Sequence, residues 1–545
     1  MHKKKYIFVV GGVMSGVGKG ITSSSIAKIM QARGFSVTAL KIDPYINVDA
    51  GTMNPTEHGE VFVLDDGDET DQDMGNYERF LNSNFSRVNY MTTGRVYLEV
   101  IRKERNLDYK GKCVEVVPDI PLEVIKRIEN AAKLAKADIT VIEIGGTVGE
   151  YQNILFLEAA RMLKTKLPKD VTFVMVSYLP IPDKLGEMKT KPTQYATRTL
   201  NSAGVQADII IARSTHSLDK KRKEKISIFC NLPARNVISA PDVESIYDVP
   251  LNFEKDNLGN ILSEVLDLPK RKANLNDWKS FVSKTKNGKK NVNIAVVGKY
   301  FDSGNFILSD VYISVLEAIK FSSYYLKVKP KLTYINSKDF ESKKLKLDVL
   351  SAFDGVLVPG GFGANGVEGI ISAIHYVREK KIPFFGLCYG MQLAVVEFAR
   401  NVVGWKDAHT SEINKKTKYP VIDIMENQKS HLNRGKYGAT MRLGSWKANL
   451  KNGSVAADSY GTNKISERHR HRYEVNPKLV EKLEKAGLVF SGYSSDKKLM
   501  EIAELPKNLH PFFLGTQFHP EFKARPLSPH PLFTAFLKAA LQGKK

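Results

Sequence analysis

Short runs of consecutive apolar residues recur along the first half of the chain and alternate with amphipathic segments. Strands covered on both faces read as apolar nearly throughout, whereas strands with one wet face alternate apolar and polar residues. The runs here are rich in valine and isoleucine, so they predict a parallel sheet with helices on both faces. The segment 21–34 is the clearest helix, and it ends at Gly34, as helices often do. We expect strands at residues 6–10, 36–42, 138–144, 171–179, 207–214 and 236–240.

A second series of the same kind begins near residue 292, after a polar, lysine-rich stretch without a sustained apolar period. We interpret that stretch as a linker with a short helix at 276–284. The sequence therefore predicts an α/β fold with two domains, each a mostly parallel sheet with helices on both faces. The expected strands of the second domain are 292–300, 331–337, 353–361, 382–388 and 513–522. The expected boundaries are 1–268 for the first domain, 269–293 for the linker and 294–545 for the second domain.

Composition limits the class of protein. With 545 residues, 42% of them hydrophobic, the chain is long enough for several cores and is globular rather than disordered. No stretch approaches the roughly 18 apolar residues that cross a bilayer, and the first apolar run ends at Gly11, too soon for a secretory signal. We therefore expect a cytoplasmic protein that does not enter a membrane. Its three cysteines are too few and too scattered for a disulfide framework or a zinc site.

The charge balance favours polyanionic partners. The chain has 81 lysines and arginines against 59 acidic residues, a net charge of +22. Its basic runs are not interleaved with aromatic residues and match no nucleic-acid recognition module. A solvated, lysine-rich surface explains them without any ligand. We expect small polyphosphates as partners and no nucleic acid.

A glycine-rich loop, residues 11–20 (GGVMSGVGKG), joins the first expected strand to the first expected helix. In this arrangement backbone N–H groups and a helix N-terminus face an anion, and Lys19 would reach the outer phosphates. The spacing departs from G-x-x-x-x-G-K-[ST], because Val13 stands at the first glycine position and Gly20 follows the lysine. An ordinary strand, turn and helix is the alternative. The strand–loop–helix context favours phosphate binding.

Two carboxylates could complete a triphosphate site with Mg²⁺, which prefers hard oxygen ligands. Asp73 ends the acidic stretch DDGDETDQD, for which an exposed acidic loop is the alternative. Glu143 lies near the carboxyl end of an expected strand, where open parallel sheets bind ligands. An isolated carboxylate beside apolar residues is costly unless it is paired or bound to a metal. Glu143 is therefore the stronger candidate.

The segment GLCYG in the second domain is the cysteine counterpart of the G-x-S-x-G elbow, with Cys388 at a sharp strand-to-helix turn. A helix N-terminus favours the thiolate. Downstream, His519 and Glu521 are two residues apart, so on an extended segment both point to one face. Glu521 could orient His519, which would deprotonate Cys388. A buried structural cysteine and a core histidine are the alternatives for each residue taken singly.

Backbone N–H groups of Gly360 and Gly361, in VPGGFG, could form an oxyanion hole together with that of Tyr389. Several independent parts of one mechanism therefore agree. The second domain is predicted to be a hydrolase with a cysteine, a histidine and a glutamate.

Taken together, these motifs resemble the CTP synthase family. The second domain resembles a class I glutamine amidotransferase. The first carries, in order, GGVMSGVGKG, KIDPYINVDAGTMNPTEHGEVFV, DDGDETDQDMGNYERF, EIGGTVGE and KTKPTQ. The resemblance runs from about Tyr6 to beyond Phe533. It implies a P-loop ligase of pyrimidine biosynthesis, in which ATP phosphorylates the 4-oxygen of UTP and ammonia released from glutamine displaces the phosphate to give CTP.

The resemblance also implies roles for individual positions. For ATP these are Gly16, Val17, Gly18, Lys19, Gly20, Ile21, Asp73, Pro241, Asp242 and Val243. For UTP or CTP they are Ser15, Glu150, Tyr151, Gln152, Lys189, Thr190, Lys191, Pro192, Thr193, Gln194 and Lys225. For glutamine they are Gly361, Tyr389, Gly390, Met391, Gln392, Glu412 and Arg472. The catalytic residues would be Cys388, His519 and Glu521, and the magnesium ligands Asp73 and Glu143. Lys41 matches a further lysine near the phosphates, and His58 resembles a residue of a loop linked to GTP.

The partners implied by the resemblance are ATP, UTP, L-glutamine, Mg²⁺, GTP as activator and CTP as product inhibitor, in a homotetramer that could extend into filaments. Two other functions stay open. One is a different glutamine-dependent ligase, such as one that amidates a carboxylate on a larger cofactor; KTKPTQ and KIDPYINVDAGTM argue against it. The other is a nucleotide-sensing scaffold with degenerate sites, against which the intact catalytic residues argue.

Overall fold

A computed structural model describes residues 4–184, 186–301, 309–425, 428 and 438–543. The chain forms two compact units, each described by itself below. The first consists of Met1–Asp49 and Asn76–Val282, and the second of Ala50–Gly75 and Ser283–Lys545. Contacts therefore group residues 50–75 with the second half of the chain, although they lie between two strands of the first unit.

The first unit is built on a seven-stranded sheet in the order β5-β2-β6-β1-β7-β8-β9. Every pairing in it is parallel, so the predicted parallel sheet is confirmed. All six expected strands are present, and β5 is an addition. The strands are β1 (Lys5–Gly11), β2 (Val37–Asp43), β5 (Tyr90–Thr92), β6 (Ile139–Ile144), β7 (Val171–Tyr178), β8 (Ile209–Ser214) and β9 (Val237–Pro241).

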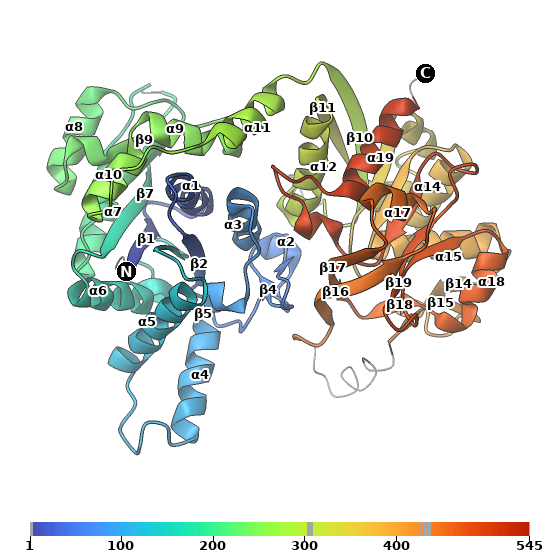
Figure 1. The fold of residues 1–545 in the computed structure, drawn as a ribbon, viewed down its shortest axis with the longest axis horizontal. Coiled ribbons are helices and arrows are strands. Elements are labelled where there is room, and N and C mark those ends of the chain that lie inside the picture. Colours follow the sequence, from blue (N-terminus) through green and yellow to red (C-terminus); the bar gives the residue numbers. More distant parts are fainter. Residues whose placement is uncertain (1–3, 185, 302–308, 426–427, 429–437, 544–545) are drawn as a thin grey trace. The chain divides into compact units, whose positions relative to one another are not determined.

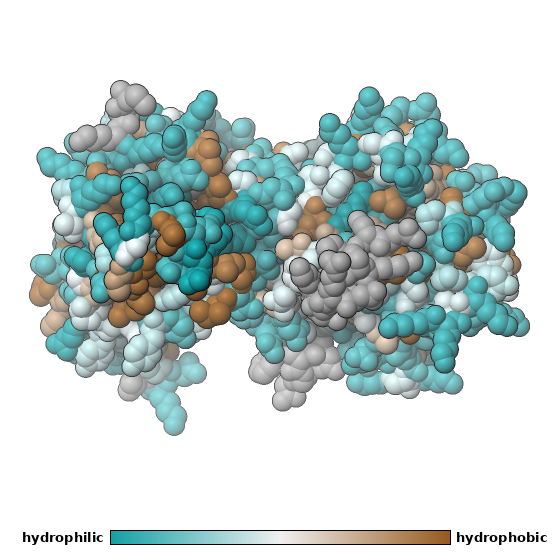
Figure 2. Space-filling model, turned by 90° about the horizontal axis from the view of Figure 1, so that it is seen from below, coloured by the Kyte–Doolittle hydropathy of each residue, from teal (hydrophilic) through white to brown (hydrophobic). Residues whose placement is uncertain are grey.

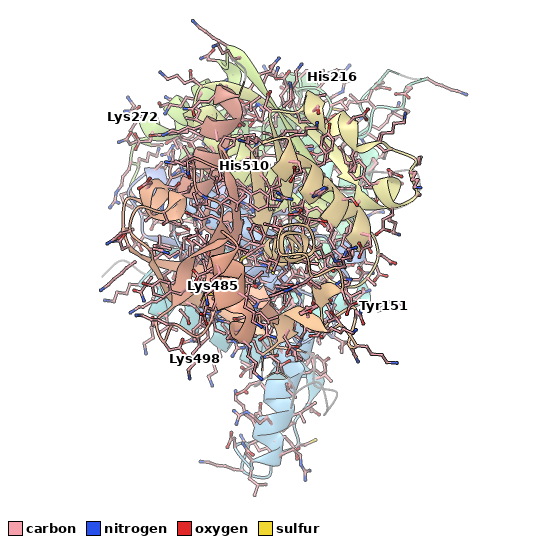
Figure 3. The ribbon with its side chains drawn as sticks, turned by 90° about the vertical axis from the view of Figure 1, so that its right-hand side faces the viewer. Tyr151, His216, Lys272, Lys485, Lys498 and His510 are labelled. Carbon is pink, nitrogen blue, oxygen red and sulfur yellow. The ribbon has the colours of Figure 1, made fainter. Side chains whose placement is uncertain are left out.

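Helices cover both faces of this sheet (Figure 1). One face carries α1, α9 and α10, and the other is closed by an apolar core that α5, α6 and α7 share with the sheet. Helix α4 and the turn after it extend away from the body of the unit (Figures 1 and 3). The helices are α1 (Lys19–Ala32), α3 (Asp73–Leu81), α4 (Thr93–Arg105), α5 (Val116–Leu134), α6 (Ile154–Lys166), α7 (Lys191–Ser202), α8 (Lys220–Cys230), α9 (Val249–Lys255) and α10 (Leu258–Val265).

The helix expected inside the linker is confirmed as α11 (Asn276–Lys286). Its Trp278 is buried among the rings of Phe80, Tyr247 and Phe281, and its indole N–H donates to the Tyr247 carbonyl at 2.9 Å. Burial of large aromatic rings contributes strongly to a core. The first part of this polar stretch is thus anchored to the first unit.

The second unit contains a nine-stranded sheet in the order β11-β10-β12-β13-β21-β20-β19-β16-β17. The first five strands in this order pair in parallel and are the five expected strands. The remaining four pair antiparallel and were not expected. The strands are β10 (Lys290–Gly298), β11 (Val328–Asn336), β12 (Gly355–Val358), β13 (Phe384–Leu387), β16 (Arg442–Leu450), β17 (Lys464–His471), β19 (Val489–Ser494), β20 (Met500–Glu504) and β21 (Phe513–Thr516).

A small sheet of β14 (Ala408–Thr410), β15 (Tyr419–Ile424) and β18 (Tyr473–Val475) lies in the same unit. Four helices share one apolar core with both sheets: α13 (Ser337–Glu341), α14 (Val367–Glu379), α15 (Tyr389–Asn401) and α18 (Val480–Lys485). Three others lie outside that core: α12 (Ile313–Tyr325), α17 (Val455–Tyr460) and α19 (Pro531–Gln542). Of these, α19 contacts β10, β12, α12 and α17.

Residues 50–75, with α2 (Pro55–His58), β3 (Phe62–Val63) and β4 (Glu69–Thr70), are held against β17 by two ion pairs. The guanidinium of Arg468, which has no exposed surface, lies 2.7 Å from Asp65 Oδ1, and Arg470 Nε lies 2.7 Å from Glu69 Oε1. Buried arginine–carboxylate pairs of this kind specify one arrangement of the segments they join. This explains why contacts assign the segment to the second unit.

The surface in Figure 2 is mainly hydrophilic, with apolar residues gathered beside the α4 arm. On α4 itself Leu98 and Ile101 are exposed apolar side chains, and so is Leu107, which follows the helix. Among the described residues, no helix is both long enough and apolar enough to span a bilayer.

Candidate active sites

The glycine-rich loop leaves the carboxyl end of β1 and leads directly into α1. Gly16 has φ 68° and Gly18, the residue before the helix, has φ 92°, a region that glycine adopts without steric cost. The first N–H groups of α1 have no partner within the helix. The loop therefore presents backbone donors at a helix N-terminus, which is the arrangement that binds phosphate groups.

Lys19 folds back over this loop. Its Nζ donates to the carbonyl of Gly146 at 2.8 Å, and a Cβ on Gly11 would lie 2.8 Å from the same nitrogen. Gly11 is therefore needed to let the lysine cross the end of β1. The contact links the loop after β1 with the loop after β6, so two of the predicted nucleotide motifs meet at one edge of the sheet.

Helix α7, which carries most of KTKPTQ, reaches the same edge. A Cβ on Gly12 would lie 2.7 Å from Ala196 Cβ, and one on Gly149 would lie 3.0 Å from Thr199 Cγ2. Because β1 lies between β6 and β7, the direction of the crossover connections changes beside it, and ligands of open α/β sheets bind at that point. The fold thus gathers the phosphate loop, EIGGTVGE and KTKPTQ at the position where a nucleotide is expected.

Glu143 is buried at this edge with only 1% of its surface exposed. Its Oε1 accepts from Lys41 Nζ at 2.8 Å, and its Oε2 accepts a hydrogen bond from the hydroxyl of Tyr77. Lys41 is also 3.7 Å from Asp43 Oδ1. The positive charge of Lys41 therefore compensates the carboxylate, because burying an unpaired charge is costly. Sequence reasoning missed Tyr77, because only the packing of α3 brings it here.

Asp73 is the first residue of α3, one turn before Tyr77. Its backbone N–H donates to Asp71 Oδ1 at 2.8 Å. Among the described residues there is no cluster of three or more histidine, cysteine or acidic side chains that could hold a metal ion. Mg²⁺ is usually bound by one or two carboxylates together with phosphate oxygens and water.

The remaining expected nucleotide residues lie on loops and helix starts of the first unit. Glu150, Tyr151 and Gln152 are exposed, Tyr151 to 94%, and Figure 3 shows it at the surface. Thr193 and Gln194 are buried on α7, whereas Lys191 and Lys225 are exposed. Lys189 pairs with Glu187 at 2.6 Å.

Pro241 ends β9 and is followed by Asp242 and Val243. Asp242 forms an ion pair of 2.9 Å with Arg213, whose Nε would lie 3.7 Å from a Cβ on Gly18. Arg213 therefore joins the phosphate loop to Asp242, one of the residues expected to bind ATP. Sequence reasoning missed it, although its place near the end of a strand was a signal of the same kind as for Glu143.

In the second unit, Cys388 stands between β13 and α15 with φ 49° and ψ −97°. This conformation costs a non-glycine residue roughly 1–3 kcal/mol and is typical of functional turns. A Cβ on Gly386 would lie 2.7 Å from the Gly390 carbonyl carbon, and one on Gly390 would lie 2.3 Å from the Val358 oxygen. Both flanking glycines are therefore required, and the structure has the geometry of the predicted elbow.

His519 follows β21, and its Nδ1 lies 2.7 Å from Glu521 Oε1. Burial lowers the pKa of His519, but the negative charges of Glu521 and Cys388 outweigh burial and raise the pKa above its ordinary value. No described residue forms a hydrogen bond with His519 Nε2. That nitrogen is the one that can take the thiol proton.

Gly360 places the oxyanion segment against this histidine. A Cβ on Gly360 would lie 2.8 Å from His519 Cε1 and 3.8 Å from Cys388 Cβ, so the cysteine and the histidine approach the same point. A Cβ on Gly361 would lie 3.7 Å from Tyr389 Cδ1. The three residues whose N–H groups were expected to form an oxyanion hole thus lie around the nucleophile.

The expected glutamine residues lie near the elbow and on loops beside the small sheet, where Glu412 follows β14 and Arg472 precedes β18. Glu412 Oε1 accepts from the Gly363 N–H at 2.7 Å, and burial raises the pKa of Glu412. Arg472 donates to Thr440 Oγ1 at 2.7 Å and to Gln428 Oε1 at 2.8 Å. Met391 and Gln392 are buried on α15, and Gln392 donates to the Tyr473 carbonyl at 2.8 Å. A carboxylate and a guanidinium suit the two charged groups of an amino acid.

Models of known families match both halves of the chain. The CTP synthase N-terminus matches residues 5–268, and glutamine amidotransferase class-I matches residues 307–539. CTP synthase of Thermococcus gammatolerans is 51% identical over 542 residues, covering 99% of each chain. The chain belongs to the CTP synthase family.

Similarity within this family extends across distant organisms. CTP synthase of Clostridium kluyveri is 47% identical over 541 residues, covering 99% of each chain. A solved structure of the Trypanosoma brucei CTPS glutaminase domain with bound acivicin is 39% identical and covers 46% of this chain and 94% of that chain, with a TM-score of 0.41. Because the two full-length CTP synthases each cover 99% of this chain, the predicted membership of the family is confirmed over nearly the whole sequence.

Proposed function

We propose that this member of the CTP synthase family converts UTP to CTP with ATP, using ammonia that it releases from L-glutamine. One observation carries the proposal. In one unit Cys388, His519 and Gly360 approach one another, and in the other unit the phosphate loop and KTKPTQ lie at one edge of the sheet. Each unit has the parts of one half of the reaction.

In the glutaminase half, His519 takes the proton of Cys388, and the sulfur attacks the glutamine side-chain amide. Glu521 holds the imidazole through Nδ1 at 2.7 Å, which leaves Nε2 for the proton. Backbone N–H groups of Gly360, Gly361 and Tyr389 stabilise the oxyanion. His519 returns the proton to the leaving ammonia, and water then releases glutamate. Glu412 and Arg472, with α15, hold the charged ends of the substrate.

In the synthase half, the γ-phosphoryl group of ATP is transferred to O4 of UTP, and ADP is released. The transfer is needed because the 4-oxygen itself is a poor leaving group, whereas phosphate is a good one. Positioning and charge stabilisation account for most of the catalysis of such transfers. Lys19 and the N–H groups after Gly18 bind the phosphates. Ammonia then adds at C4, and phosphate departs.

The carboxylates Asp73 and Glu143 are proposed as magnesium ligands. Their hard oxygens fit Mg²⁺, and Glu143 lies 2.8 Å from Lys41, which places a positive charge beside it. Held there, Mg²⁺ would supply positive charge that offsets the negative charge of the phosphate groups. Lys41 would then share its positive charge between the carboxylate and the phosphates.

The finer assignments are proposals of the same kind. We assign Gly16–Ile21, Asp73 and Pro241–Val243 to ATP, and Ser15, Glu150–Gln152, Lys189–Gln194 and Lys225 to UTP or CTP. On the family resemblance we also propose GTP as activator, CTP as inhibitor and a homotetramer that could form filaments. A place in the cytoplasm is proposed from the sequence pattern alone. Exposed apolar side chains such as Leu98 and Ile101 support assembly, because apolar patches on a surface commonly mark interfaces.

The test compares two nitrogen sources in the presence of ATP, UTP and Mg²⁺. Cys388→Ala is expected to abolish CTP formation from glutamine and to keep CTP formation from ammonium salts. Equal loss with both sources would contradict a two-site enzyme. Saturable UTP binding that Lys189→Ala weakens would exclude the other glutamine-dependent ligases, whereas indifference to UTP would exclude CTP synthesis.

A further inference from the structure

Gln517 is fully buried beside the nucleophile, two residues before His519. Its side-chain Nε2 donates to Cys388 Sγ at 3.6 Å, and its Oε1 accepts from Gln392 Nε2 at 3.3 Å. Its backbone N–H donates to the Glu501 carbonyl at 2.8 Å, which holds the residue in register with β20. The amide thus bridges the sulfur and the first turns of α15.

The direction of this bridge is set by a backbone carbonyl. Gln392 Nε2 also donates to the Tyr473 carbonyl at 2.8 Å, and a carbonyl oxygen can only accept. The NH₂ group of Gln392 therefore faces both Tyr473 and Gln517, so the oxygen of Gln517 faces Gln392 and its own NH₂ group faces the sulfur. Exchanging the oxygen and nitrogen of either amide would lose at least one of these three contacts.

The sulfur has a second polar neighbour, which accepts a hydrogen bond, whereas the NH₂ group of Gln517 donates one. The Arg470 carbonyl lies 3.9 Å from Cys388 Sγ and can accept only from the thiol. The hydrogen bond from Gln517 Nε2 to the sulfur becomes stronger when the thiol becomes a thiolate, because hydrogen bonds to charged groups are stronger. Deprotonation should therefore turn the sulfur from Arg470 toward Gln517.

The other titratable groups near this point are few. His519 and Glu521 lie on the segment after β21, and His469 and His471 lie on β17, 2.9 Å apart. Burial and the charge of Arg442 lower the pKa of both β17 histidines well below the ordinary value, so they stay neutral at working pH. A change in the pH profile of Cys388 alkylation would therefore report on His519 or on the Gln517 amide.

We propose that Gln517 is a positioning residue of the glutaminase site, which holds the Cys388 sulfur in its attacking orientation and stabilises the thiolate. The inference rests on the proposed glutaminase function and deepens it. Gln392 orients the Gln517 amide, and because Gln392 also lies in the expected glutamine site, occupation of that site is coupled to the nucleophile.

The test measures the rate at which iodoacetamide alkylates Cys388 in the full-length protein as a function of pH, by mass spectrometry of its peptide. Gln517→Glu keeps the size of the side chain but removes the donor and adds a negative charge. It should move the midpoint of the profile upward by about one pH unit or more and lower kcat for glutamine about tenfold near neutral pH. Gln517→Met, which only removes the donor, should shift the midpoint in the same direction by less.

The matched control is Thr516→Val, which removes a buried hydroxyl that donates to the Phe518 carbonyl at 2.9 Å but does not touch the sulfur. It should leave the alkylation profile unchanged. CTP formation from ammonium salts, retained in every variant, shows that the chain has folded.

Wild-type profiles in both Gln517 variants would overturn the proposal and reduce Gln517 to a packing residue. A shift in Thr516→Val as large as in Gln517→Glu would overturn it as well, because any disturbance of the segment would then suffice. If the wild-type chain released no ammonia from glutamine, the proposed function would fail, yet the alkylation profiles would still decide whether Gln517 acts on the sulfur.

Discussion

Lys41 and Glu143 occupy matched positions on the neighbouring parallel strands β2 and β6, and their charged atoms lie 2.8 Å apart. Both side chains are buried, and Tyr77 donates to the second carboxylate oxygen. Lys41 therefore compensates a buried carboxylate at the carboxyl edge of the sheet, where little solvent reaches it. This relationship makes Glu143 a suitable partner for a cation bound with the nucleotide.

Glu143→Gln keeps the shape of the side chain and removes its charge. We expect CTP formation to fall at least about tenfold with either nitrogen source, and the Mg²⁺ concentration for half-maximal rate to rise. Steady-state rates over a Mg²⁺ titration measure both effects. Glu129→Gln is the control, since Glu129 pairs with Lys166 at an exposed position of the same unit. Equal behaviour of the two variants would rule out the magnesium role.

Lys19→Ala removes the cation that crosses the end of β1. CTP formation should fall by about 10²- to 10³-fold with glutamine and with ammonium salts alike, because the transferring phosphoryl charge loses its nearest lysine. Basal glutamine hydrolysis should stay at the wild-type rate, since Lys19 is in the other unit. Lys133→Ala, at an exposed position of α5, should change neither rate. Loss of glutamine hydrolysis in Lys19→Ala would contradict the separation of the two sites.

Gly360→Ala tests the approach of the oxyanion segment to His519. The new Cβ would lie 2.8 Å from His519 Cε1, closer than carbon atoms tolerate, so the imidazole must move. We expect kcat for glutamine hydrolysis to fall about 100-fold, as for a misplaced catalytic group, while ammonia-driven synthesis continues. Gly543→Ala is the steric control in the same unit, because its Cβ would lie 4.0 Å from its nearest neighbour, the Ala540 oxygen. A similar loss of kcat in both variants would argue against a specific clash with His519.

Glu474 gives a prediction about pH. Burial raises the pKa of Glu474 to about 8, although Arg442 Nη1, 3.2 Å from its Oε1, opposes the shift. Between the unfolded pKa near 4.5 and the folded value, the folded state binds more protons than the unfolded state. The contribution of Glu474 to stability is therefore complete below about pH 4.5 and is lost as the pH rises through about 8.

Glu474→Gln should match the wild type near pH 5 and exceed its stability near pH 9, because the amide stays neutral. Hydrogen exchange of peptides from β17 and β18, compared between the two proteins at each pH, measures this local stability. An equal difference at both pH values would show that Glu474 is ionised throughout.

Local patterns were enough to predict the parallel core of each sheet, the phosphate loop and the Cys388 elbow. In each case the residues that matter are adjacent in sequence: an apolar run covered on both faces, or glycines at the positions where a Cβ would clash. The four antiparallel strands of the second unit were not predicted, since their apolar and polar residues depend on which face the neighbouring strands cover. The attachment of residues 50–75 to β17 was also missed, because Arg468 and Asp65 are 403 positions apart.

Neighbouring residues alone are enough to predict two α/β halves, the CTP synthase family, and the residues proposed as nucleophile, base and phosphate-binding lysine. Contacts between distant segments add what no local pattern contains: Lys41 and Tyr77 bind Glu143, Arg213 approaches the phosphate loop, and Gln517 faces the sulfur. Helices, strands and elbows are specified by neighbouring residues, whereas a buried charge or amide acquires its partner from segments that meet only when the sheets have assembled.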